Sequence, residues 1–226
     1  MFLDILTGNL SASIYRYPEV ITYLHSREVT DQEIQKFGLG YSKIVTVPTE
    51  ESQDRKNFVD ECFNGRKLEN KIIFPFRDIM GSVTGLIGRS IGTKDFKVFV
   101  LERAKFEGFF FGLFEALPYI YAENKVYLVE GPFDLLALSK ALPNSVATMS
   151  SKMTDAQYDI LTLFCDNIVT VFDSDKAGDL GREGAKEKDK RIQHILFGYK
   201  DPAKLLEDVK LKKFREYVMK KVKEIF

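Results

Sequence analysis

The sequence predicts an α/β protein in which a parallel sheet is flanked by helices. Two observations support this prediction. From about residue 119 onward, short apolar runs alternate with segments of helical pattern, as in sheets whose parallel strands are joined by helices. Of the 226 residues, 45% are hydrophobic and 29% are charged, so the chain can bury the core of one large domain or two small ones. We expect a mixed α+β region at residues 1–118, the sheet at residues 119–226 and a C-terminal helix.

The elements of the first region are indicated by caps, turns and β-rich runs. Thr30 and Glu33 form a capping box that opens a short helix. Residues 71–76 and 83–87 read as a hairpin, whose first strand is an edge or irregular strand because it contains Pro75. Residues 109–116 read as an aromatic helix that stops at Pro118.

The second region alternates strands with helices. Its expected strands are residues 126–129, 145–148, 168–172 and 193–197. Its expected helices are residues 133–142, a segment opened at Thr154 by a second capping box, and a polar segment that begins near Gly178. Apolar residues at helical spacing in residues 202–226 predict an amphipathic helix that packs on the body, with a membrane-surface helix as the alternative.

Composition excludes several classes of protein. Lys plus Arg equals Asp plus Glu, at 33 each, so the chain is not uniformly basic. The two cysteines and two histidines are too far apart to form a zinc motif, so we expect no zinc, and sparse cysteine is typical of a reducing compartment. With no signal-like leader and no run of about 18 apolar residues, we expect a cytoplasmic protein without a membrane segment.

Acidic residues follow two of the predicted strands. Glu130 comes directly after the strand at 126–129 and Asp134 lies one turn later, while Asp173 and Asp175 follow the strand at 168–172. If these strands are neighbours, the four carboxylates converge at one edge of the sheet. Mg²⁺ or Mn²⁺, as hard cations that prefer oxygen ligands, can offset their mutual repulsion. The alternative is that such residues only cap helices, which fits Asp134 about equally well.

These motifs resemble a known family. Residues 130–134 (EGPFD) and 172–178 (FDSDKAG) are similar to the two signature motifs of the Toprim domain, and Asp201-Pro202 resembles its third acidic element. Upstream segments resemble the catalytic core of bacterial and phage DnaG-type DNA primases, namely residues 23–27, 37–41, 73–78, 85–90 and 112–116.

The resemblance implies a Toprim-type fold and template-directed synthesis of short RNA primers on single-stranded DNA from nucleoside triphosphates. It implies two or more Mg²⁺ or Mn²⁺ ions held by Glu130, Asp173, Asp175 and Asp201, with Asp134 also catalytic and Glu130 the candidate general base or acid. Arg77, Arg89 and Lys97 are expected to bind template or nucleotide, in a segment with seven basic and three acidic residues between 71 and 105.

The sequence departs from the family pattern at Ala203, where a second acidic residue usually follows. It also shows no N-terminal zinc ribbon and no long helicase-binding region, which suits a phage enzyme or a catalytic fragment. A zinc-module protein or a replicative helicase are therefore expected partners in trans. Two alternatives stay open: a Toprim-type nuclease with the same metals, and a catalytically weak nucleic-acid-binding subunit of a replication complex.

Overall fold

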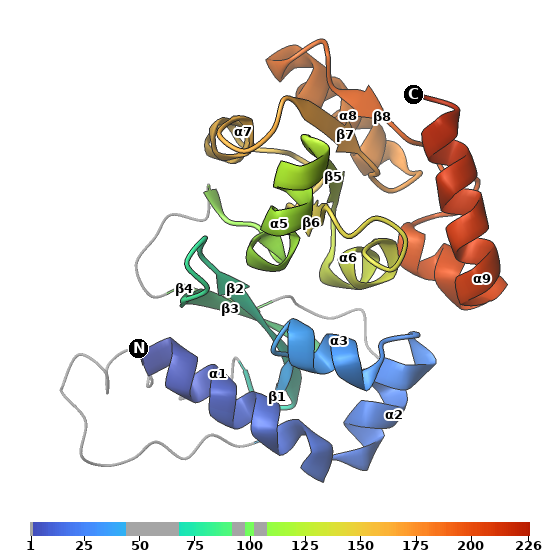
Figure 1. Ribbon diagram of the computed structural model, residues 1–226. Helices are drawn as coiled ribbons and strands as arrows, with labels where there is room; N and C mark the ends of the chain where they lie inside the picture. Colours follow the sequence, from blue (N-terminus) through green and yellow to red (C-terminus); the bar gives the residue numbers. More distant parts are fainter. Residues whose placement is uncertain (1, 44–67, 92–97, 102–107) are drawn as a thin grey trace. The chain divides into compact units, whose positions relative to one another are not determined.

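The computed structural model describes residues 2–43, 68–91, 98–101 and 108–226, which divide into two compact units (Figure 1). Unit 1 comprises residues 1–25, 30–76 and 82–105. Unit 2 comprises residues 106–226 together with two short upstream segments, residues 26–29 and 77–81. The domain boundary predicted at residue 118 stays a prediction.

Unit 1 combines helices with a four-stranded sheet. Its helical segments are α1 (Phe2–Ser13), η1 (Ile14–Arg16), α2 (Pro18–Ser26) and α3 (Asp31–Lys36). Its strands are β1 (Gly40–Ser42), β2 (Lys71–Arg77), β3 (Val83–Ser90) and β4 (Val98–Leu101), which lie in that order. The pairs β1–β2 and β3–β4 are antiparallel, and α1 packs on β1 and β3.

Two features predicted from the sequence, the capping box at Thr30 and the strand that contains Pro75, are found in unit 1. Thr30 caps α3, because its hydroxyl accepts the Glu33 N–H while the Glu33 carboxylate accepts the Thr30 N–H. We expected Pro75 to mark an edge or irregular strand; it lies in β2, which is an interior strand and not an edge strand. The neighbouring β1 pairs only with residues 71–73, so Pro75 lies beyond this ladder and its missing N–H breaks no bond to β1.

Unit 2 contains the predicted parallel sheet. Its strands are β5 (Lys125–Val129), β6 (Ser145–Ala147), β7 (Asn167–Thr170) and β8 (Gln193–His194), in the spatial order β6-β5-β7-β8. All three neighbouring pairs are parallel. The chain therefore leaves β5 toward β6 and later returns to place β7 on the other side of β5. Such a reversal of strand order is the position at which open α/β sheets bind ligands.

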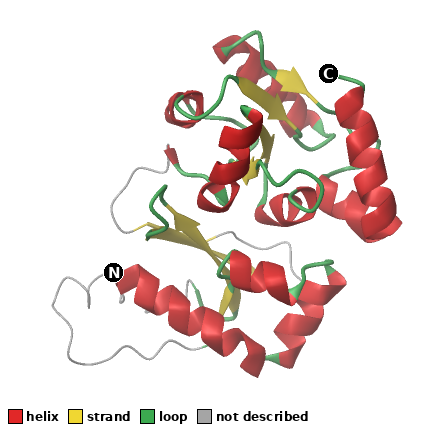
Figure 2. Ribbon diagram, viewed as in Figure 1, coloured by secondary structure: helices red, strands yellow, loops and turns green. Residues whose placement is uncertain are grey.

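Helices cover the sheet, as the yellow strands among red helices in Figure 2 show. These helices are α5 (Leu113–Glu123), α6 (Pro132–Leu138), α7 (Asp155–Thr162), α8 (Lys176–Lys188) and α9 (Pro202–Lys223). One core cluster joins Val126 and Leu128 of β5 to residues of α5, α7 and α8. The alternate residues Tyr127 and Val129 are also buried, and α6 packs against both β6 and α9.

The helix expected at residues 109–116 was placed wrongly. The α5 helix begins at Leu113, after Gly112 in the left-handed region (φ 85°), and it continues through Pro118 to Glu123. Pro118 is tolerated because it lies on the exposed side of the helix, where the carbonyl that loses its partner can face water. Phe111 instead forms an antiparallel bridge with Ala147, and its aromatic ring is buried in the core.

The second capping box does more than begin a helix. Thr154 and Gln157 form the box at the start of α7, and the buried Gln157 amide also donates to the carbonyls of Phe109 (2.7 Å) and Thr148 (3.1 Å). One amide thus ties α7 to two other segments of unit 2.

We expect Gln157→Glu to destabilise unit 2 by about 2–3 kcal/mol, because a carboxylate keeps the cap but faces two carbonyl oxygens without a proton to donate. Urea unfolding followed by circular dichroism at pH 8 measures this loss. The matched control is the reverse exchange in the other capping box, Glu33→Gln, which keeps its acceptor and should change stability by less than about 0.5 kcal/mol. Equal effects of the two exchanges would contradict the role of the Gln157 amide.

Candidate metal centre

Acidic side chains gather at the carboxyl edge of the unit 2 sheet. Glu130 follows β5, Asp134 lies in the first turn of α6, and Asp173 follows β7. Because β5 and β7 are parallel neighbours, these loops leave the sheet side by side. Asp134, Asp173 and Asp201 each offer a carboxylate oxygen within 4.8 Å of those of the other two.

Asp173 is the centre of this group. Its Oδ1 atom is buried and has no hydrogen-bond partner. Burial is the largest of the effects that raise the pKa of Asp173 to about 7; the nearby carboxylates of Glu130 and Asp201 act in the same direction and the charge of Lys200 opposes them. The backbone N–H of Asp173 donates to Glu130 Oε1 (3.0 Å), which connects the two loops directly. Such an unpartnered, electron-rich oxygen is what a bound cation satisfies.

Helix capping, the alternative left open for Asp134, is found at two of the other carboxylates. The N-cap residue of α6 is Gly131, and Asp134 Oδ1 accepts the Ala203 N–H of α9 at 3.4 Å. The helix caps are Asp175, which accepts the Gly178 N–H (3.0 Å), and Asp201, which accepts the Lys204 N–H (2.7 Å). Capping fixes one oxygen of Asp201 at the start of α9, and the same residue still reaches the carboxylate group.

The arrangement is compatible with a divalent cation. Three partly buried carboxylates converge, and one of them has a buried oxygen that needs a positive partner. All three donors are oxygens, which favours Mg²⁺ or Mn²⁺. Glu130 and Asp175 lie beside the trio, since both act electrostatically on Asp173. Ala203, which departs from the family pattern, contributes its backbone N–H to Asp134.

Sequence reasoning missed one residue of this site, Arg182. It is buried, and its Nη1 donates to the backbone carbonyls of Phe172 (3.2 Å) and Asp173 (3.0 Å). The only sequence signal was its position two turns into the helix that Asp175 caps.

The three basic residues predicted to bind nucleotide or template have different surroundings. Arg77 forms an ion pair with Glu115 of α5. Arg89 lies near the end of β3 and is partly exposed. Lys97 lies outside the described residues.

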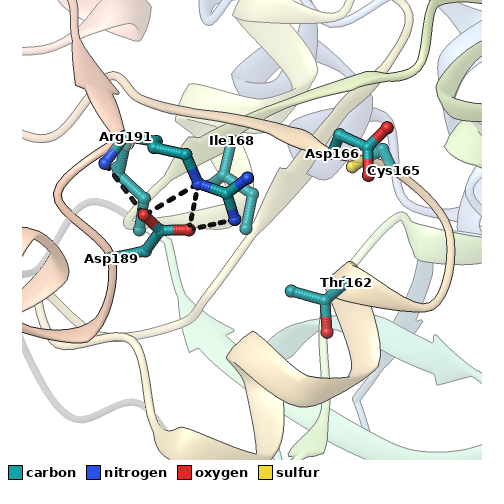
Figure 3. Close-up of a pocket in the computed structure, with 7 residues that line it drawn as sticks. Thr162, Cys165, Asp166, Ile168, Asp189 and Arg191 are labelled. Atoms are coloured by element: carbon teal, nitrogen blue, oxygen red, sulfur yellow. Dashed lines mark hydrogen bonds and ion pairs between the residues drawn. The ribbon is translucent and has the colours of Figure 1, made fainter.

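A separate cavity of about 70 Å³ lies at the opposite end of the sheet, where β7 and β8 begin (Figure 3). Asp189 and Arg191 form an ion pair at its wall, and burial raises the pKa of the Cys165 thiol there to about 11. This volume is about that of two water molecules, so the cavity is too small for a nucleotide. The carboxylate group is therefore the better candidate for a functional site.

In the described part of the chain, no helix combines the length and the apolar character that crossing a bilayer requires.

Comparison with known proteins agrees with the site. A family model described as Toprim-like matches residues 127–206, which include Glu130, Asp134, Asp173, Asp175 and Asp201. The DNA primase of Rickettsia prowazekii is 27% identical over 180 residues, covering 71% of this chain and 30% of the relative. The DNA primase of Aquifex aeolicus is 30% identical over 197 residues, covering 78% of this chain and 39% of the relative. The chain thus spans about a third of the length of these relatives.

Solved structures show the same fold. The Escherichia coli primase catalytic core has a TM-score of 0.81 at 21% identity, with 96% of this chain and 78% of that chain covered. A DnaG primase catalytic domain bound to single-stranded DNA has a TM-score of 0.80 at 21% identity, with 96% and 79% covered. The predicted fold class and the resemblance to a DnaG-type primase core are confirmed by these comparisons.

Proposed function

We propose that this chain, whose sequence and fold resemble those of a DnaG-type primase core, synthesises short RNA primers on a single-stranded DNA template. The reaction is nucleotidyl transfer, in which a 3′-hydroxyl attacks the α-phosphate of a nucleoside triphosphate and pyrophosphate leaves. The observation that supports it is the convergence of Asp134, Asp173 and Asp201 around a buried, unpartnered oxygen at the carboxyl edge of the sheet.

The carboxylates take distinct roles in this proposal. Asp134, Asp173 and Asp201 hold Mg²⁺ or Mn²⁺, with Asp175 supporting Asp173. When bound, two such ions activate an attacking oxygen and stabilise the leaving one. Glu130 fixes the Asp173 loop through its bond to the Asp173 N–H and serves as a metal ligand or as the general base that accepts the hydroxyl proton.

Binding of template and nucleotide is assigned to Arg89, Arg77 and Lys97. Phosphate contacts by such residues are independent of sequence and weaken with salt. In the structure Arg77 is paired with Glu115, so a phosphate contact by Arg77 requires exchange of that partner. A helicase or a zinc-module protein remains the proposed partner in trans.

A Toprim-type nuclease would use the same carboxylates. The extent of the sequence similarity favours the primase, because the 180 aligned residues of the Rickettsia relative reach well beyond the Toprim-like segment at 127–206.

Primer synthesis on single-stranded DNA with labelled nucleoside triphosphates and Mg²⁺ or Mn²⁺ tests the proposal. Asp201→Asn keeps a good helix cap but removes one anionic ligand. We therefore expect the primer yield of this variant to be at least about tenfold below that of the wild type, with no loss of stability. The control Asp155→Asn removes an exposed carboxylate of α7 and should leave the yield unchanged. Shortened template without new product would favour the nuclease, and DNA binding without any reaction would favour a non-catalytic subunit.

A further inference from the structure

Arg182 is a buried cation whose bonds are directed at the backbone of the metal centre. Only 8% of the residue is exposed. Its Nη1 donates to the Phe172 carbonyl at 3.2 Å and to the Asp173 carbonyl at 3.0 Å, and its Nη2 pairs with Asp179 one turn earlier in α8. The guanidinium is thus used to bind a loop and not a substrate.

The bound carbonyls lie where the sheet no longer holds the chain. The β7 strand ends at Thr170, and the Val171 N–H still reaches the Leu128 carbonyl of β5 at 2.7 Å. Beyond that bond, Arg182 supplies the donor for Phe172 and Asp173. Without Arg182, the Phe172 carbonyl in its buried bond and the Asp173 carbonyl in its partly buried bond would each lose a charge-assisted donor.

The rest of the Asp173 backbone is fixed from other elements. The Asp173 N–H donates to Glu130, and the Ser174 N–H donates to the Lys200 carbonyl at 2.8 Å. Ser174 Oγ also donates to the Phe197 carbonyl at 3.1 Å. With both sides of the residue held, the Asp173 carboxylate is directed at Asp134 and Asp201 although the three repel one another.

We propose that Arg182 is a positioning residue for the metal centre, which holds the backbone of residues 172–173 so that the Asp173 carboxylate faces the bound divalent ion. The inference deepens the proposed function and rests on it. Partners of metal ligands commonly change metal affinity by about 10–100-fold when they are removed, because the ligand then has to be ordered on binding.

Isothermal titration calorimetry of the full chain with MgCl₂ alone measures the Mg²⁺ affinity and tests this role. We expect Arg182→Met to bind Mg²⁺ at least tenfold more weakly than the wild type. Arg182→Lys retains the charge and can reach one carbonyl, so it should recover part of the Mg²⁺ affinity. If the methionine variant does not fold, the lysine variant still tests the role of Arg182. Asp179→Asn leaves both carbonyl bonds in place, and the Asp179 carboxylate that it replaces is 68% exposed, so the Mg²⁺ affinity of this variant should stay within about threefold of the wild type.

Gln157→Glu tests for a purely structural role, because it is expected to lower the stability of unit 2 while Arg182 and the carboxylates of the metal centre are unchanged. Its Mg²⁺ affinity should equal that of the wild type. The inference is overturned if both Arg182 variants bind Mg²⁺ as tightly as the wild type, or if Gln157→Glu weakens binding as much as they do. A wild type that binds no Mg²⁺ overturns the proposed function itself, whereas tight wild-type binding that is insensitive to Arg182 overturns only the positioning role.

Discussion

Replacing Asp173 by asparagine is expected to abolish metal-dependent activity and, in the same protein, to raise stability. The loss of activity should be at least about 10²-fold, because the central anionic oxygen of the group is removed. The gain in stability is expected because Asp173 Oδ1 is buried without a hydrogen-bond partner, and burying a charged oxygen in this way destabilises the folded protein. An asparagine amide can instead donate to the carboxylates of Asp134 and Asp201 nearby.

The gain depends on pH in a defined direction. The pKa of Asp173 rises from 3.8 to about 7 in the folded chain, so between these two pH values the folded protein retains a proton that the unfolded protein releases. The stability that comes from this proton is present at low pH and is lost as the pH rises through 7. Asparagine does not ionise, so its advantage over aspartate should be about 1–2 kcal/mol at pH 8 and close to zero at pH 4.

Thermal unfolding in EDTA, compared between pH 4 and pH 8, measures this difference. Addition of MgCl₂ at pH 8 should raise the melting temperature of the wild type and leave that of Asp173→Asn unchanged, because only the former binds the ion. Asp155→Asn is the control, with unchanged activity and no gain in stability. An Asp173→Asn protein that is less stable than the wild type at pH 8 without metal would show that the carboxylate is not strained.

The second large effect concerns three glycines of α8, at positions 178, 181 and 184. A Cβ at Gly178 would lie 2.0 Å from the Asp173 carbonyl oxygen, and one at Gly181 would lie 2.0 Å from the Ser151 carbonyl oxygen. Both contacts are with backbone, which cannot rotate away. A Cβ at Gly184 would meet nothing within 4 Å.

We therefore expect Gly181→Ala and Gly178→Ala to destabilise unit 2 by about 3 kcal/mol each, since the helix must move away from its neighbours. Gly184→Ala should stabilise it by about 0.5–1 kcal/mol, the usual gain from replacing glycine in a helix. Urea unfolding of the three variants checks the order. Gly178→Ala should also lose Mg²⁺ affinity because it displaces the Asp173 carbonyl, and equal stability of all three variants would contradict this packing.

The sequence predicted well those elements that are encoded by neighbouring residues. Both capping boxes open helices, at Thr30 and Thr154, because the cap and its partner are three residues apart. The parallel sheet followed from the alternation of strands and helices. Pro118 was misjudged because a local rule against proline in helices ignores whether the freed carbonyl faces solvent.

The metal centre was predictable only in part, for a physical reason. The proximity of Asp173 and Asp134 could be predicted because each follows a strand of the same sheet. That Asp134 accepts a bond from α9, and that Asp201 lies within reach of Asp173, depends on where the helices pack. The role of Arg182 could not be predicted from the sequence, because its acceptors are backbone carbonyls, which every residue has.

The contribution of α9 to the site has a thermodynamic consequence. Asp201, one of the three carboxylates, is the N-cap of that helix, and the Ala203 N–H of the same helix donates to Asp134 Oδ1. An ion held by this group therefore favours the docked position of α9 on α6, and docking of α9 raises the affinity for the ion by the same factor. Any partner that binds and shifts this helix would act on the metal through linkage, with no contact to the metal site.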